Sequence, residues 1–418
     1  MLKTYRPWVM LAFAMLMLIV SNGMILSGLS AFDKALINEF GWSRGALKAR
    51  DLITLLATGL AAPFIGMVID RIGVRKLILL GAAVLAVAYV LYGQVQTTLH
   101  VYAIHLLFAV VLIGCGLNVA VILVSNWFVA KRGTALGIAI AGTSLGGMIF
   151  PPLITQLIAQ QGWRDTFVTL SVAPVALLLI ALVLVKSKPA DSGELAYGET
   201  NAGAVAGGSM GAGSTGRNAL ATGAAGAASG LTFSEATRTP TFWILCFTAS
   251  MTFYAMMSAM AHLFLHMQDM GFAPPVAAKA LSLMFGLALV GKLVFGTLAD
   301  YIDQKRVFLA NLVVMLLGAI TLATLDKSLI WAAIAMYGLG WGGMYTMLQL
   351  QAVNSFGLKA AGKILGTLVM VEAIGGGVGI FLTGVMFDAF KSYQMAFAVI
   401  CVVLLLSLIA STRVQRYR

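Results

Sequence analysis

Two charged residues stand inside long apolar segments in the C-terminal half of the chain. Lys292 lies within residues 289–296, and Glu372 lies within residues 368–377. In a helix that crosses a bilayer, a central lysine costs roughly 3 kcal/mol or more, so it should face a cavity or a counter-charge. Both residues lie roughly 12–14 Å from the same membrane face, at about 1.5 Å per helical residue. We therefore expect a Lys292–Glu372 ion pair, because each charge alone would be buried without a partner.

Such a pair has a structural and a functional interpretation. The structural interpretation is a salt bridge that only holds two helices together. Ionisable residues within the membrane are functional by default, however. We favour anion binding by Lys292, with Lys292 and Glu372 together coupling the anion to a proton that Glu372 carries.

Polar and aromatic residues in other apolar segments are further candidates for substrate binding. Asn22 and Asn118 offer amide groups, and Tyr254, Tyr337 and Trp341 offer amphipathic rings. Tyr337 and Trp341 are four residues apart, so they share one helix face. For each of these side chains the alternative is an interhelical hydrogen bond or plain packing.

A third group of charges opens the second apolar segment at residues Lys48, Arg50 and Asp51. These charges could steer anions towards a funnel, but we expect them to form a solvated helix end. On this interpretation only the C-terminal half carries charges within the membrane.

The elements that position these residues are predicted from composition and hydropathy. Of 418 residues, 60% are hydrophobic and 10% are charged, whereas a soluble domain has about 25% charged residues. A bilayer-spanning helix needs roughly 20 apolar residues. We predict an all-α membrane protein with twelve transmembrane helices, near residues 8–30, 49–69, 77–95, 100–125, 134–160, 166–186, 241–266, 278–299, 307–325, 329–353, 364–387 and 394–412.

The distribution of basic residues predicts the orientation. The net charge is +12, and most Lys and Arg residues fall on the side of the N-terminus. The positive-inside rule then places both termini in the cytoplasm of a bacterial inner-membrane protein. Topology explains the positive charge, so we expect the lipid bilayer and no nucleic acid as a partner.

The chain also repeats itself at a spacing of about 230 residues. The stretch 66–76 corresponds to 296–306, and Gly146-Gly147 corresponds to Gly375-Gly376. We predict two pseudo-symmetric six-helix bundles, residues 1–186 and 241–418, joined by a flexible cytoplasmic linker rich in Gly, Ala and Ser at 187–240. The glycine pairs are expected at the seam along which the halves rock. At the repeat positions of Lys292 and Glu372 stand Ala62 and Thr143.

The loop after the second helix carries a resemblance to a known family. Its residues Asp70, Arg71, Gly73, Arg75 and Lys76 resemble the signature loop of the major facilitator superfamily, with a weaker copy at Asp300, Lys305 and Arg306. The resemblance implies the major facilitator fold, and it implies that these loop residues latch neighbouring helix ends.

Other motifs resemble the bacterial monocarboxylate porters and the oxalate:formate antiporters. They are Gly41-Trp42-Ser43-Arg44, Gly162-Trp163-Arg164 and His262-Leu-Phe-Leu. In both groups an arginine at the position of Lys292 binds the substrate carboxylate. The chain departs from animal monocarboxylate transporters at Ala288, where they carry an aspartate. It also lacks the second cation that suits oxalate.

We predict a secondary transporter of a small organic anion, a proton-coupled symporter of a lactate-like monocarboxylate that works as a monomer by alternating access. The alternatives are an oxalate:formate type exchanger, a drug exporter and a non-transporting receptor. The sequence shows no nucleophile–base pair, metal cluster or phosphate loop, so we expect neither enzyme activity nor a metal or cofactor.

Overall fold

The computed structural model describes residues 5–199, 230–357 and 359–417, and these residues form helices without any strand. Caps explain several helix starts: Ser43, Thr97, Thr239 and Asp303 each accept a hydrogen bond from a backbone N–H in the first turn. The first half contains α1 (Arg6–Asn22), η2 (Gly23–Ser27), η3 (Gly28–Phe32), α2 (Asp33–Phe40), α3 (Arg44–Ala61), η4 (Ala62–Phe64), α4 (Ile65–Ile72), α5 (Val74–Tyr92), α6 (Thr98–Cys115), α7 (Leu117–Trp127), α8 (Arg132–Leu170) and α9 (Val172–Leu184).

The second half repeats this arrangement after the linker region. It contains α12 (Pro240–Asp269), α13 (Pro274–Tyr301), α14 (Gln304–Ala323), α15 (Ile330–Phe356), α16 (Ala361–Phe390) and α17 (Gln394–Ser411), and the flanks of the linker add the short helices η5 (Pro189–Ser192) and α11 (Phe233–Thr237).

The predicted twelve-helix membrane fold is confirmed within the described residues. In the described ranges, nine helical segments are long and apolar enough to cross a membrane. One of them, Arg132–Leu184, is kinked at Gly162, where φ is +80°, and forms two crossings. The segment from α3 to α4 and helix α15 complete the set. The chain is therefore a multi-pass membrane protein.

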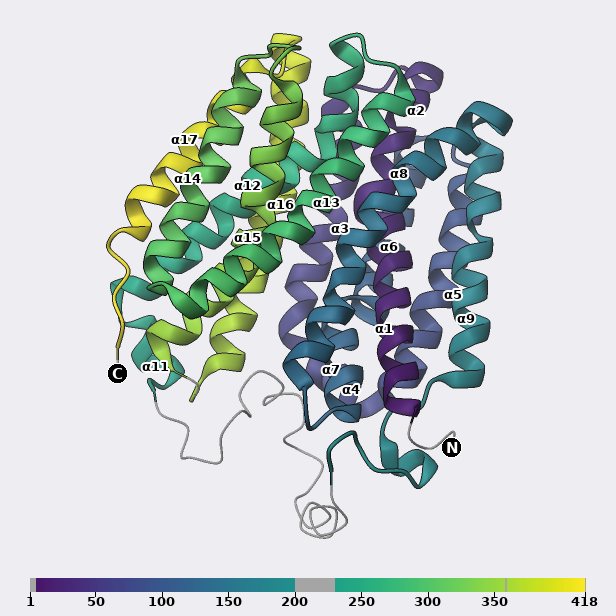
Figure 1. Ribbon diagram of the computed structural model, residues 1–418. Coiled ribbons are helices and arrows are strands. Elements are labelled where there is room, and N and C mark those ends of the chain that lie inside the picture. The colour runs from purple at the N-terminus through teal and green to yellow at the C-terminus, as the bar shows by residue number, and fades with distance from the viewer. Residues whose placement is uncertain (1–4, 200–229, 358, 418) are drawn as a thin grey trace.

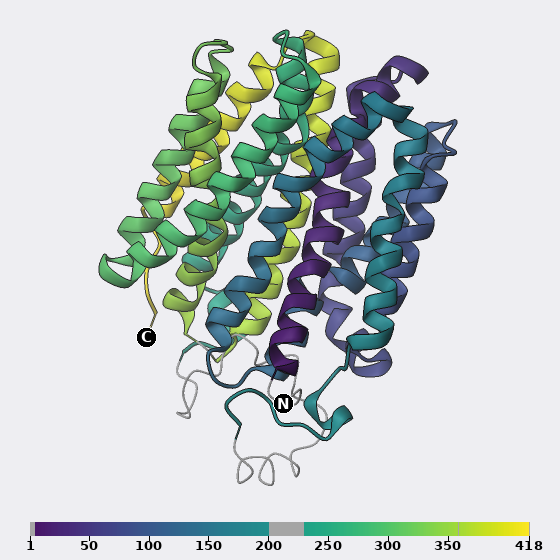
Figure 2. The same ribbon diagram turned by 45° about the vertical axis from the view of Figure 1, so that its right-hand side comes forward.

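The two halves lie side by side, and both termini lie at one end of the bundle (Figures 1 and 2). We call this the terminal end and the opposite one the distal end. The halves meet along two seams, one between α3 and α16 and the other between α8 and α13. Because α3 and α8 of the first half correspond to α13 and α16 of the second, the repeat relates the two seams.

Glycines line both seams, as the sequence predicts. A Cβ added to Gly147 would lie 2.3 Å from the Phe285 ring, and one added to Gly377 would lie 3.0 Å from Leu52, each in the opposite half. The neighbouring Gly146 and Gly375 instead allow close backbone packing within their own half. The seam helices therefore approach closely on two sides at once.

The halves are joined at the distal end and separate towards the terminal end. Among the described residues, hydrogen bonds between the halves involve only Arg44 and Gly45 at the distal end, Ser282 below them and Lys292 at mid-depth. Near the terminal end, a Cβ added at Gly137 of α8 or at Gly366 of α16 would meet no atom within 4 Å. The structure is thus closed at its distal end.

The described flanks of the predicted linker, 187–199 and 230–239, make specific contacts. Glu194 accepts a 2.6 Å hydrogen bond from Arg6, and the Tyr197 ring packs edge-on against Trp8. On the other side, Leu231 N–H donates to the carbonyl of Phe356. The remainder of the predicted linker, 200–229, lies outside the described residues.

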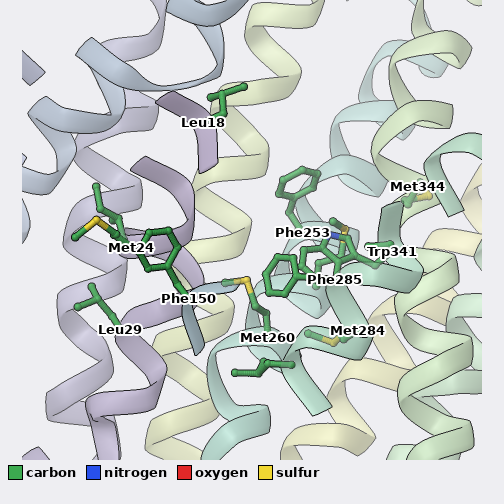
Figure 3. Close-up of a cluster of buried hydrophobic side chains, with 14 of the residues drawn as sticks. Leu18, Met24, Leu29, Phe150, Phe253, Met260, Met284, Phe285, Trp341 and Met344 are labelled. Carbon is green, nitrogen blue, oxygen red and sulfur yellow. The ribbon is translucent and has the colours of Figure 1, made fainter. Parts of the chain in front are cut away.

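Between the halves, buried apolar side chains from α1, α8, α12, α13 and α15 gather (Figure 3). Phe150 contributes from the first half, and Phe253, Phe285 and Trp341 contribute from the second (Figure 3). The interior near the seams is therefore largely apolar, so polar groups within it stand out.

Candidate substrate-binding site

Lys292 projects from α13 across a seam between the halves. Its Nζ donates hydrogen bonds to Thr143 Oγ1 at 3.1 Å and to Ser144 Oγ at 3.0 Å, both on α8. The ammonium also lies 5.3 Å from the ring centroid of Tyr345 on α15, a favourable cation–π position. No carboxylate within the described residues forms an ion pair with it.

Glu372 is buried in α16, with 7% of its surface exposed. No hydrogen bond or ion pair joins it to any other described residue, so the expected Lys292–Glu372 pair is wrong for this conformation. The repeat gives the reason. Lys292 contacts Thr143, which is the repeat counterpart of Glu372, so the repeat predicts that Glu372 faces the counterpart of Lys292, which is Ala62.

Contacts along the second seam agree with this assignment. A Cβ added to Gly59 of α3 would lie 2.6 Å from the Cβ of Ala373, the residue next to Glu372. The cation therefore lies in the α8–α13 seam, whereas the acid lies on α16, one of the two helices of the α3–α16 seam. Glu372 is also within electrostatic reach of Tyr345, the ring beside Lys292. Equal depth in the membrane did not imply contact.

The predicted aromatic residues separate into two environments. Trp341 packs at 4.7 Å against the Phe285 ring, near the seam that holds Lys292. Tyr337 is fully buried, with its hydroxyl unpaired, and its backbone packs on Gly318 of α14 within the second half. Tyr254 is 5% exposed on α12, and its carbonyl packs against Gly379 of α16.

The predicted amides differ in exposure. Asn118 is exposed near the start of α7 and has no hydrogen bond within the described residues. Asn22 is half-buried, and its amide donates to Ser21 Oγ, which in turn donates to the carbonyl of Cys115. The structure does not bring either amide into contact with Lys292.

The signature-loop cations stabilise helix ends within their own halves. Arg75 donates to the carbonyl of Leu182 in the last turn of α9. Its repeat counterpart Lys305 donates to the carbonyls of Thr412 and Val414 beyond α17. Gly73 adopts a φ of +84° at the sharp turn between α4 and α5, where a residue with a side chain would be strained.

The other loop residues make fewer contacts. Arg71, Lys76 and Asp300 are exposed, and the backbone N–H of Arg306 donates to Asp303. The Asp70 side chain lies outside the described part of the chain, so the predicted latch at this residue stays a prediction.

The expectation of a solvated helix end at residues 48–51 is wrong. The side chains of Lys48 and Arg50 are 1% and 0% exposed, and both form ion pairs with Asp33, which is itself 0% exposed. Asp51 lies 3.6 Å from Lys48 and 3.7 Å from Arg50. We call Asp33, Lys48, Arg50 and Asp51 the distal cluster. The first half therefore also buries charges.

Sequence reasoning missed the partners of Lys292 and the acid that organises the distal cluster. From the sequence, Thr143 was noted only as the repeat counterpart of Glu372. That repeat position was the signal that could have identified it as a partner of Lys292. Asp33 is the first residue of the polar helix α2, which folds back so that Asp33 reaches the first turns of α3. No local pattern in the sequence predicts this packing of α2 against the start of α3.

Comparisons with known proteins agree with this architecture. Residues 9–380 match the family model of the Major Facilitator Superfamily. An uncharacterized transporter of this type from Bacillus subtilis, YcxA, is 23% identical over 95% of this chain and 92% of its own length. The oxalate:formate antiporter of Oxalobacter formigenes is 23% identical, over 89% of this chain and 84% of its own.

A solved structure shares the fold at low sequence identity. It is the bacterial homologue of the human lysosomal transporter Spinster, in an inward-facing and occupied conformation. The TM-score is 0.74 at 15% identity, covering 98% of this chain and 96% of that one. The extent of the family match, with the duplicated six-helix halves, shows that the chain belongs to the Major Facilitator Superfamily of membrane transporters.

Proposed function

We propose that the protein moves a small organic anion with one carboxylate across the membrane together with a proton, by alternating access of its two halves. The observation that carries the proposal is Lys292, a cation between the halves that has two hydroxyl partners and, within the part of the chain that the structure describes, no acidic partner. A carboxylate is the partner that would neutralise it, and lysine offers a point charge to that group.

Rocking of the halves would act directly on this site. Lys292 belongs to α13, whereas Thr143 and Ser144 belong to α8 of the other half. Separation of these helices removes the hydroxyl contacts and frees the ammonium for an anion. Trp341 and Phe285 nearby provide an apolar wall for the body of the substrate, and the exposed Asn118 is a candidate polar contact.

Glu372 is the proposed proton carrier of the α3–α16 seam. A carboxylate buried without a partner is costly when charged, so closing the seam around it favours the protonated form. Opening the seam to water favours release of the proton. The proton and the anion would thus bind in different seams, and the rocking of the halves would couple them.

The relatives support the substrate class by their names alone. They include the oxalate:formate antiporter and, over 31% of this chain, the human monocarboxylate transporter 14 at 28% identity. We propose that both termini face the cytoplasm and that the distal end faces outward. The closed distal end then corresponds to an inward-facing state.

Proteoliposome transport tests the proposal. Formate, lactate, pyruvate and oxalate serve as substrates, and an internal pH dye reports proton entry. We expect Lys292→Ala to abolish uptake of the transported anion, Lys292→Arg to retain part of it, and Lys279→Ala, an exposed lysine on the same helix, to behave as the wild type.

Other outcomes would replace the proposal. Uptake that needs internal counter-substrate and ignores pH would indicate an exchanger. Uptake that survives Lys292→Ala for every carboxylate would remove Lys292 as the anion site. Tight binding of a carboxylate without flux would indicate a receptor.

A further inference from the structure

The distal cluster is a second, separate set of buried charges. Asp33 lies between the two cations: its carboxylate forms a 2.6 Å ion pair with Lys48 and a hydrogen-bonded pair with Arg50. Arg50 also donates to Tyr92 Oη at 2.9 Å and lies 3.4 Å from the carbonyl of Leu29. The two cations and two carboxylates sum to zero, which is the arrangement that burial tolerates best.

Asp51 is the loosely held member of the distal cluster. Among the described residues, its carboxylate has only the two long contacts to Lys48 and Arg50. Its side chain is 16% exposed, whereas the other three side chains are 0–1% exposed. A carboxylate without a short contact can gain or lose a proton with little rearrangement of its neighbours.

Asp51 and Lys48 also reach the interface between the halves. Both line a cavity of about 10 Å³ at the distal side of the α3–α16 seam, which is about enough for one water molecule. Across the cavity stand Met260, Ala261 and Ile380 of the second half. Closing the distal end therefore sets an apolar wall over a charged pair.

We propose that Asp51 and Lys48 form a second binding site, which takes a proton on Asp51 together with a carboxylate anion at Lys48. The substrate class rests on the proposed function. The charge balance given next, which we call the charge rule, does not. With Asp51 ionised and no anion, the distal cluster is neutral. With Asp51 protonated and one anion bound, it is neutral again. A proton alone leaves one positive charge, and an anion alone leaves one negative charge.

The charge rule makes closure of the distal end depend on both ligands. Closing over an unbalanced charge is costly in a buried site, so only the neutral clusters close readily. The empty cluster closes as in this structure, and the doubly loaded cluster closes around a cavity wider than the 10 Å³ of this empty state. The proton comes from the distal solution and forms an O–H bond with one carboxylate oxygen of Asp51. The same bond breaks when that side chain next meets water.

The groups around Asp51 leave this charge balance intact. Beyond the distal cluster, Tyr92 and His105 are neutral groups linked to each other and to Thr54 by hydrogen bonds. On α12, His262 lies within electrostatic reach of Lys48, and its two ring nitrogens are occupied by Tyr393 Oη and the carbonyl of Ile380. Farther out, Arg44 is neutralised by a bidentate contact with Asp269.

A distance measurement without substrate tests the charge rule. Spin labels at Gln96 and Ser328, exposed on the distal loops of the two halves, report opening by electron–electron resonance in HEPES–Tris at pH 8. We expect Asp51→Asn and Lys48→Gln, which unbalance the distal cluster in opposite directions, each to raise the open-to-closed ratio at least about tenfold. The balanced double variant should close like the wild type.

Two results would overturn the proposal. One is a wild-type distance distribution in both single variants. The other is a double variant as open as the single variants, because lost contacts rather than charge would then explain the opening. Glu39→Gln, which changes an acid on a distal surface paired with Arg164, is the control that should not move the distribution.

A transport measurement then connects the site to the proton. In proteoliposomes, Asp51→Asn should keep anion exchange but carry fewer protons per anion than the wild type, because Glu372 is unchanged, and Asp51→Glu should restore the ratio. A wild-type ratio in Asp51→Asn would refute the proton site. If Lys292→Ala leaves carboxylate uptake intact while the distance results follow the charge rule, the proposed function fails and the distal site stands.

Discussion

Asp33 and Glu372 are both buried carboxylates, but only Asp33 has cationic partners. Removing one partner of a buried ion pair costs about 3–5 kcal/mol, because the other charge is left uncompensated. We expect Asp33→Asn to lower the thermal unfolding midpoint strongly in detergent. Glu372→Gln should leave the midpoint unchanged or raise it, because no cation loses a partner. An equal loss in both variants would indicate that Glu372 is paired.

The hydroxyls that hold Lys292 also lead to a testable difference. A hydrogen bond from a charged donor to a neutral acceptor contributes about 1.5–3 kcal/mol to the free energy of unfolding. The double variant Thr143→Val with Ser144→Ala should therefore be less stable than the wild type. A bound carboxylate should raise its melting temperature by more than it raises that of the wild type, because the anion replaces both lost acceptors. Ser125→Ala, a buried hydroxyl without a partner, is the matched control.

A smaller ligand-induced shift in the double variant would contradict an anion site at Lys292. It would mean that Thr143 and Ser144 bind the substrate themselves rather than hold the ammonium in its absence.

For single residues, the sequence was sufficient to identify charges within apolar segments, but it did not show how these charges pair. Lys292 and Glu372 were recognisable as charges in apolar segments, and depth follows from helix rise. Pairing also depends on which seam each helix faces, and depth carries no information about that. The repeat did carry it, since Thr143 stands at the counterpart of Glu372 and contacts Lys292.

At the scale of elements, Arg75 and Lys305 perform the same task in the two halves. Each donates to carbonyls at the end of the last helix of its half, α9 or α17. These carbonyls lack intrahelical partners, and a cation there also suits the helix dipole. We expect Arg75→Ala and Lys305→Ala each to cost about 1–3 kcal/mol, measured as lowered thermal unfolding midpoints of similar size.

The neighbouring loop cations provide the controls for this comparison. The Lys76 and Arg306 side chains make no hydrogen bond or ion pair within the described residues, so Lys76→Ala and Arg306→Ala should change stability little. A large effect at Lys76 and none at Arg75 would show that general loop charge, and not capping, is what matters.

Hydropathy and the repeat were sufficient to predict the helices, since apolar length and duplicated motifs are local signals. The distal cluster was not predictable in this way. Its burial depends on η3 and α2, which turn back after the first crossing and bring Asp33 to the start of α3. A charged run at a helix start looks solvated until the chain that covers it is known.

For the whole molecule, the distal contacts determine which end is closed. Arg44 donates two hydrogen bonds to Asp269 and one to Tyr393 Oη, and its guanidinium lies 3.6 Å from the Phe387 ring centroid. Near the terminal end, the described residues form no hydrogen bond between the halves. The balance between the two end states therefore rests largely on a few side chains at the distal end.

Asp388 is the sharpest test of that balance. Its carboxylate accepts hydrogen bonds from the backbone N–H groups of Arg44 and Gly45 at 2.9 and 2.7 Å. These N–H groups have no acceptor within the helix, because they lie in the first turn of α3, where the helix dipole also favours an anion. Asp388→Ala leaves both donors unsatisfied only while the distal end is closed, so it should shift the population towards the distal-open state, about tenfold for each 1.4 kcal/mol lost.

The shift can be measured by labelling a cysteine at Ala261, which is 3% exposed and lines the distal cavity in the closed state. In a background without the native cysteines, a membrane-impermeant maleimide added at the distal side should react faster in Asp388→Ala. The control Asp326→Ala changes an exposed acid in the loop between α14 and α15 and should leave the rate unchanged. An unchanged rate in Asp388→Ala would mean that the packed seams alone keep the distal end closed, because the lost contact is made only between the halves.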